Sequence, residues 1–179
     1  MQNAQAVYTS KRVMTGRKFA ELAEGHGVEI RFLGLGGFVP SDREALSGQA
    51  LTKAAGGALL VVGAREPELS VLAELDILIE RRDQAAVAAL LNAHRLPWCE
   101  LYTRSFQYKR EVTARPKDKA KIDGSIPKTR LGDLKKAKIR YIFSNPSRKK
   151  GGGDFMNLLA AALVEACEGV LADYQRPSR

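Results

Sequence analysis

The chain has 179 residues, of which 29 are Lys or Arg and 20 are Asp or Glu, so its formal net charge is +9 and its pI is about 9.7. This length suits one domain with a sizeable core, and the basic balance excludes an acidic tail and favours polyanionic partners. Cys99 and Cys167 lie in separate apolar segments, which argues against a disulfide framework or a zinc site. No apolar run reaches the roughly 18 to 20 residues that span a membrane. Residues 1–15 lack a signal-peptide core, so we expect a soluble cytoplasmic protein without membrane insertion.

Hydrophobic spacing predicts alternating helices and strands in the first half of the chain. Gly25 ends the first helix, Gly63 ends a continuous apolar run typical of a buried strand, and Pro67 suits a first helical turn. The expected elements are a helix over 17–24, a strand over 28–33, a loop over 34–40, a short helix up to Leu46, a strand over 58–62, a helix over 66–75 and a strand over 77–79.

Hydrophobic spacing in the second half of the chain predicts a helix with a clear apolar repeat, two strands and a long final helix. Asp83 is the expected N-cap of the first of these helices. The expected elements are a helix over 84–92, a strand over 98–106, a basic loop or arm over 107–136, a strand over 139–143 and a helix over 154–174. Strands that alternate with helices predict a compact α+β domain, partly α/β in character, over residues 1–179.

The positive charge belongs to one segment. Residues 100–150 contain 16 Lys and Arg against five acids, and aromatic residues alternate with cations near its start. Cations neutralise phosphates and rings stack on bases, so this mixture favours DNA binding. The alternative is a half-buried strand with a solvated basic face, followed by a lysine-rich loop. The predicted DNA contacts are Arg104, Tyr108, Lys109, Arg110, Lys135, Lys136, Lys138, Arg148, Lys149 and Lys150.

Two stretches resemble a known superfamily. The segment FAELAEGHGV at 19–28 and the segment ALLVVGARE at 58–66 are similar to the opening helix and the phosphate-binding turn of the ParB/sulfiredoxin superfamily. The resemblance covers residues 17–90 and implies a ParB/sulfiredoxin-like core with a mixed sheet. Within that superfamily the chain looks most like a bacterial plasmid fertility-inhibition factor. This implies DNA binding, DNase and ATPase activity, and a block of DNA transfer by a conjugative type IV secretion system.

Two glycine turns are candidate phosphate sites, because a glycine at a strand end or helix start lets backbone N–H groups approach an anion. The first is Gly63, Ala64 and Arg65, and the second is Gly152 and Gly153 after three cations. These five residues are the predicted nucleotide-binding set. The alternatives are a strand-to-helix turn that needs Gly63 only for backbone freedom, and a plain loop in which Asp154 caps the last helix.

Phosphodiester hydrolysis needs a positioned water and charge neutralisation, usually with a metal held by carboxylates. We therefore predict Arg65 and Glu66 as catalytic residues, Glu66 and Glu68 as candidate metal ligands, and ATP and a divalent metal such as magnesium as cofactors. Acids in a first helical turn also occur without catalysis, so whether the protein is an enzyme stays open. The alternative functions are a non-catalytic DNA-binding or partition module and a basic protein that docks a secretion coupling ATPase.

Overall fold

The computed structural model describes residues 3–10, 15–34, 37–39, 59–63, 69–81, 83–112, 124, 126–145 and 152–173. Its centre is a seven-stranded sheet in the order β3-β2-β4-β5-β6-β1-β7. The strands are β1 (Asn3–Thr9), β2 (Ile30–Gly34), β3 (Gly37–Val39), β4 (Leu59–Gly63), β5 (Trp98–Ser105), β6 (Ile139–Asn145) and β7 (Val170–Asp173).

This sheet, with its helices, confirms the α+β class. Every neighbouring pair of strands is antiparallel, so the expectation of a mixed sheet is wrong for the strands described. The physical reason lies in the connections. β4, β5 and β6 are consecutive described strands, and each returns alongside the previous one in the opposite direction.

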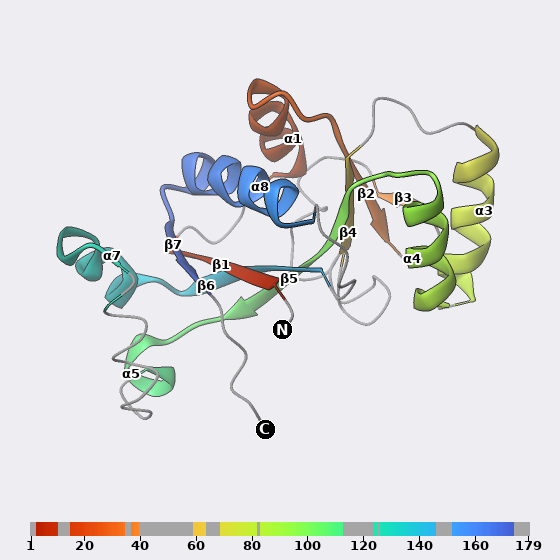
Figure 1. The fold of residues 1–179 in the computed structure, drawn as a ribbon. Coiled ribbons are helices and arrows are strands. Elements are labelled where there is room, and N and C mark those ends of the chain that lie inside the picture. Colours follow the sequence, from red (N-terminus) through yellow and green to blue (C-terminus); the bar gives the residue numbers. More distant parts are fainter. Residues whose placement is uncertain are drawn as a thin grey trace.

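One face of the sheet is covered by α1 (Gly16–Gly25) and α8 (Gly152–Cys167), which lie side by side above it (Figure 1). Alternate strand residues point to this face, and Phe19 of α1 packs its ring 6.0 Å from Phe32 and 6.1 Å from Phe143. The Thr15 hydroxyl accepts a hydrogen bond from the Lys18 amide at 3.3 Å and so caps α1.

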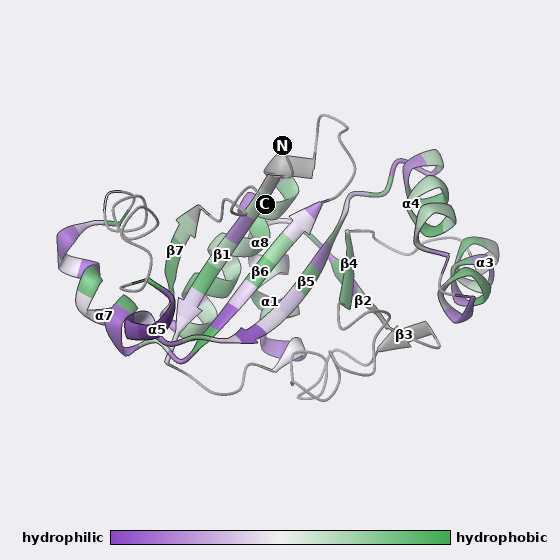
Figure 2. Ribbon diagram, turned by 90° about the horizontal axis from the view of Figure 1, so that it is seen from below, coloured by the Kyte–Doolittle hydropathy of each residue, from purple (hydrophilic) through white to green (hydrophobic). Residues whose placement is uncertain are grey.

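The opposite face carries two separate groups of helices. One is the pair α3 (Leu69–Glu80) and α4 (Gln84–Ala93), and the other is α5 (Tyr108–Glu111), the 3-10 turn η3 (Lys128–Arg130) and α7 (Leu131–Lys136). Figure 2 shows the two groups at opposite ends of the sheet, with α1 and α8 behind it. Each group has its own buried cluster, one around Leu75, Leu91 and Trp98 and the other around Leu134 and Phe106.

Several predicted elements are confirmed. The helices expected over 17–24 and 84–92 are α1 and α4, and the carboxylate of Asp83 accepts from the Ala86 amide at 3.0 Å as predicted. The strands expected over 28–33, 58–62, 98–106 and 139–143 are β2, β4, β5 and β6. The short helix expected up to Leu46 lies outside the described residues.

The strand predicted over 77–79 is wrong, because these residues belong to α3. Val71, Leu75 and Leu78 recur at helical spacing and pack against the sheet, whereas Ile77 on another side of the helix is 49% exposed. A short apolar run fits either element, and here the longer helical repeat decides. α3 begins at Leu69, and the earlier part of the helix expected over 66–75 lies outside the described residues.

The predicted helix over 154–174 is also wrong at both ends. α8 already begins at Gly152, and it stops at Cys167, where Glu168 takes a positive φ of 51°. The next residue, Gly169, packs so closely that a Cβ there would lie 2.6 Å from Cγ1 of Val7. The chain then forms β7 beside β1. Neither β7 nor the strands β1 and β3 were expected.

Part of the expected basic arm over 107–136 is ordered structure. Its described residues form α5, η3 and α7, and Tyr108, Val112 and Leu134 are buried in one cluster with Phe106. Apolar residues too widely spaced to show a period therefore anchor this segment to the sheet. Among the described residues, no helix is long and apolar enough to cross a membrane.

Candidate nucleic-acid interface

The pairing of β5 with β6 brings two basic stretches of the sequence together. In the register of these strands Arg104 lies opposite Arg140, and the amide of Phe106 donates to the carbonyl of Lys138 at 2.8 Å. α5 follows β5, α7 precedes β6, and the two helices pack against each other. We call this part of the molecule the basic lobe: α5, η3, α7 and the adjoining ends of β5 and β6.

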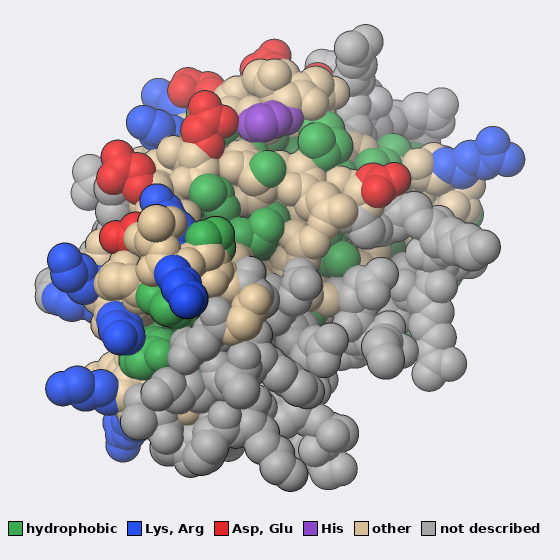
Figure 3. Space-filling view, turned by 60° about the vertical axis from the view of Figure 1, so that its left-hand side comes forward, with side chains coloured by type: hydrophobic (Ala, Val, Ile, Leu, Met, Phe, Trp, Pro, Cys, Tyr) green, Lys and Arg blue, Asp and Glu red, His purple; other side chains and the backbone are tan. Residues whose placement is uncertain are grey.

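Six cations of the basic lobe are exposed and form no ion pair with a described acidic residue. The set comprises Arg104, Lys109, Arg110, Lys135, Lys136 and Lys138, all of which were predicted from the sequence. None of the six forms an ion pair with any residue that the structure describes. Figure 3 shows several Lys and Arg side chains at the left and lower left of this view, others at the upper left and at the right, and most acidic side chains in the upper part. Such a one-signed group raises the local positive potential.

Two further arginines in this region have carboxylate partners. Arg140 lies 3.1 Å from the Glu111 carboxylate, and Arg130 lies 3.4 Å from Asp133. Neither was singled out from the sequence. The alternation of the strand expected over 139–143 indicates on which face Arg140 lies, and only the pairing of β6 with β5 places it opposite Arg104. No sequence signal identifies the contact of Arg130 with the carbonyl of Gly169 at 2.9 Å.

The aromatic residues contribute less to this surface than predicted. Tyr108 is only 8% exposed and packs in the cluster beneath α5 and α7, with the ammonium of Lys135 5.9 Å from its ring centroid. Its ring therefore has no open face for a base. Tyr102 is half-buried, donates its hydroxyl to Glu100 at 2.5 Å and has the Arg104 guanidinium 5.8 Å from its ring centroid.

Gly63 has a packing role that the sequence pattern did not reveal. It is the last residue of β4, and a Cβ there would lie 2.7 Å from Cε2 of Phe155 and 2.9 Å from Cγ of Pro97. Its amide N–H, predicted to face a phosphate, donates to the Pro97 carbonyl at 2.8 Å. The described geometry thus matches the alternative in which this glycine serves the fold. Because this N–H is hydrogen-bonded to Pro97, it does not face a phosphate site.

The second glycine turn opens the long helix. Gly152 and Gly153 are the first two residues of α8, and Asp154 lies within the first helical turn instead of capping it. Phe155, one residue further, is the side chain that packs against Gly63. The start of α8 and the end of β4 therefore lie together.

The remaining predicted site residues lie outside the described part of the chain. They are Ala64, Arg65, Glu66, Glu68, Arg148, Lys149 and Lys150. Within the described ranges, no group of three His, Cys, Asp or Glu side chains could hold a metal ion. Comparisons with protein-family models, curated proteins and solved structures find no match to this chain.

Proposed function

We propose that this protein binds nucleic acid through the basic lobe. The observation that supports the proposal is the group of six exposed cations with no acidic partner among the described residues. Surface charges normally gain little from one another, but a polyanion neutralised by several cations releases its condensed counterions, and this release favours binding.

The contacts we propose are with the phosphate backbone and not with bases. Tyr108 is buried, and the Tyr102 hydroxyl and ring already contact Glu100 and Arg104. Lysine and arginine side chains on short helices and strand ends suit phosphates, which carry no sequence information. The proposed binding is therefore weakly dependent on base sequence and strongly dependent on salt.

The test is fluorescence anisotropy with labelled single-stranded and duplex DNA over a series of salt concentrations. We compare the wild type with the triple variant Arg104→Gln, Lys109→Gln, Lys138→Gln. Each lost phosphate contact should reduce the slope of log affinity against log salt by about 0.9, and affinity should fall by about tenfold or more.

The matched control removes the same charge elsewhere, in the variant Arg17→Gln, Lys18→Gln, Arg81→Gln, whose three residues are exposed on α1 and after α3. It should keep most of the affinity and the slope. Equal affinity of the wild type and the basic-lobe variant would overturn the proposal. Binding of a polyglutamate peptide but not of DNA would favour an acidic protein partner, such as a secretion coupling ATPase.

The resemblance to plasmid fertility-inhibition factors supports a wider proposal. The bound DNA would be DNA in transfer by a conjugative type IV secretion system, and Arg65 and Glu66 would assist its hydrolysis with ATP and a divalent metal. This part rests on the sequence, because both residues lie outside the described ranges. The ParB/sulfiredoxin-like core over 17–90 is proposed on the same resemblance.

Incubation of linear DNA with the protein, magnesium and ATP tests the wider proposal. Degradation that is lost in both Arg65→Ala and Glu66→Ala would support it, and degradation that survives both changes would place the active site elsewhere. If the wild type binds DNA without degrading it, the protein is a non-catalytic DNA-binding module.

A further inference from the structure

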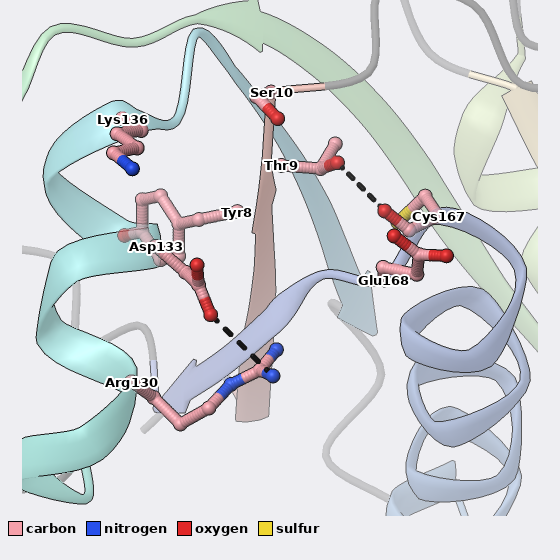
Figure 4. A pocket seen from close by; sticks show the side chains of 8 residues that line it. All are labelled: Tyr8, Thr9, Ser10, Arg130, Asp133, Lys136, Cys167 and Glu168. Carbon is pink, nitrogen blue, oxygen red and sulfur yellow. Dashed lines mark hydrogen bonds and ion pairs between the residues drawn. The ribbon is translucent and has the colours of Figure 1, made fainter.

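A hollow of about 290 Å³ lies beside the basic lobe, where α7, the end of β1 and the end of α8 meet (Figure 4). This volume is at the lower end of the range typical of ligand sites, so the hollow accommodates one small group of a larger ligand. Apart from Tyr8 and Cys167, its lining residues are polar or charged: Thr9, Ser10, Arg130, Asp133, Lys136 and Glu168.

Hydrogen bonds between its walls hold the hollow in shape. On the α7 side, the Arg130 guanidinium donates to the Gly169 carbonyl, in the turn after α8, at 2.9 Å. At the end of β1, the Thr9 hydroxyl donates to the Cys167 carbonyl at 3.0 Å. Each of these contacts joins two elements that border the hollow. The hollow therefore exists before a ligand arrives, which lowers the cost of binding.

Two side chains of α7 can contact a ligand in the hollow. Asp133 and Lys136 lie on the same side of the helix because they are one turn apart, and both line the hollow. One Asp133 oxygen lies 3.4 Å from the Arg130 guanidinium. A carboxylate has about four acceptor sites on its two oxygens, so Asp133 can accept further hydrogen bonds. Lys136 is exposed and forms no ion pair with a described residue.

The charges that line the hollow favour an uncharged ligand group that donates hydrogen bonds. The cations Arg130 and Lys136 are balanced by the carboxylates of Asp133 and Glu168, so the interior has no excess charge to hold a phosphate. A sugar hydroxyl is uncharged and can donate to a carboxylate, which only accepts. A sugar therefore suits the interior of the hollow, and a phosphate next to that sugar suits the exposed ammonium of Lys136.

We propose that the hollow receives a ribose of a bound RNA strand and that the Asp133 carboxylate accepts a hydrogen bond from its 2′-hydroxyl. The phosphate next to this ribose would lie at Lys136. The inference rests on nucleic-acid binding by the basic lobe, and it names RNA as the class of strand that binds more tightly. RNA has the 2′-hydroxyl and DNA lacks it, so this contact distinguishes the two. It involves sugar and phosphate only, in agreement with binding that depends weakly on base sequence.

The experiment measures the fluorescence anisotropy of three labelled single strands of one sequence with the full chain: RNA, DNA and RNA with 2′-O-methyl groups. The wild type should bind RNA about tenfold more tightly than DNA, the change expected from one hydrogen bond to a charged acceptor. The methylated strand cannot donate this bond and should lose the same factor. Equal affinity for RNA and DNA would overturn the inference but not nucleic-acid binding by the basic lobe. If neither RNA nor DNA binds, the proposed function fails as well.

Two variants then test the role of Asp133. Asp133→Ala removes the acceptor and also a carboxylate partner of Arg130, so the affinity for both strands should rise while the preference for RNA disappears. Glu111→Ala is the matched control. Glu111 lies in the basic lobe 3.1 Å from the Arg140 guanidinium and does not line the hollow, so this variant should keep the preference. Thermal melting checks that both variants fold. A preference that survives Asp133→Ala, or that Glu111→Ala removes equally, would overturn the inference.

Discussion

The two groups of helices on the same face of the sheet differ in length, charge and anchoring. α3 and α4 are 12 and 10 residues long and pack mainly through their own apolar side chains. α5 and α7 are 4 and 6 residues long and carry four of the six exposed cations that form no ion pair with a described residue. Helices this short are not stable alone. The basic lobe therefore owes its shape to the buried cluster beneath it.

The largest expected effect comes from removing one buried leucine in each region. Leu134 of α7 and Leu75 of α3 are both fully buried, so Leu134→Ala and Leu75→Ala should each lower the free energy of unfolding by about 2–5 kcal/mol. Urea denaturation measures this loss. Only Leu134→Ala should also weaken DNA binding under conditions where both variants are folded, because α7 presents some of the proposed contacts and α3 presents none. Equal DNA affinity of the two variants would mean that α7 presents no DNA contact.

Two glycines, Gly63 at the end of β4 and Gly132 in the basic lobe, give the next largest effect. Gly63 has no room for a methyl group beside Phe155 and Pro97, so Gly63→Ala should destabilise the protein by about 1–3 kcal/mol. Gly132 lies in α7 with nothing within 4 Å of a Cβ, so Gly132→Ala should stabilise it by about 0.5–1 kcal/mol. Thermal or urea unfolding of both variants checks the opposite signs. A stable Gly63→Ala variant would show that the helix and strand ends there can move apart.

The two regions also differ in helix capping, and we expect removal of the cap residues to change the free energy of unfolding by a smaller amount. Asp83 caps α4 through its carboxylate, whereas Gln107, the residue before α5, makes no side-chain capping bond. Asp83→Ala should therefore cost about 1 kcal/mol of unfolding free energy, and Gln107→Ala should change it by less than about 0.5 kcal/mol. The comparison uses chemical denaturation of the two variants at one pH. A large loss for Gln107→Ala would mean that the side chain stabilises the basic lobe in another way.

The smallest effect concerns β5, the strand that runs between the two regions. Burial raises the pKa of the Cys99 thiol, and the negative charge of Glu100 raises it further. The unfolded chain loses this proton at lower pH than the folded protein does. Stability should therefore fall as pH rises above the ordinary thiol range near about 8.5. Cys99→Ala should lose less stability than the wild type between neutral and alkaline pH, as urea denaturation at both pH values can show.

Thiol labelling provides a second measurement. Both described cysteines are buried, and the Cys167 thiol donates to the Leu163 carbonyl at 3.0 Å. An aromatic disulfide reagent should label neither residue in the native protein and both in denaturant. Rapid native labelling of Cys99 would show that β5 opens locally.

Elements that have a local signal in the sequence were predicted well. The pairing of strands was predicted poorly. Asp83 before an apolar repeat predicted α4, and the run ended by Gly63 predicted β4. β1 and β7 are short or weakly apolar, and they pair with residues far away in the chain, such as Ala6 with Ala172. No local pattern contains that information. The helix end at Cys167 had one signal, Gly169, but its close contact with Val7 depends on the same distant pairing.

The candidate site was predictable in composition but not in arrangement. Six of the predicted cations are exposed on one lobe, which follows from the charge of the segment and the pairing of β5 with β6. The burial of Tyr108 was not predictable, because aromatic residues between cations occur both in grooves and in small cores. Nor was the hydrogen bond of the Gly63 amide, since Pro97 lies 34 residues further along the chain.

The position of β1 has a consequence for how the molecule folds. β1 lies between β6 and β7, and its residues pair with partners such as Asn145 and Ala172 near the other end of the sequence. Such distant pairings must wait for long loops to close, and proteins dominated by them fold in milliseconds to seconds. During synthesis β1 would leave the ribosome long before its partners. Its hydrogen-bonding edges would be available to chaperones until β6 and β7 arrive.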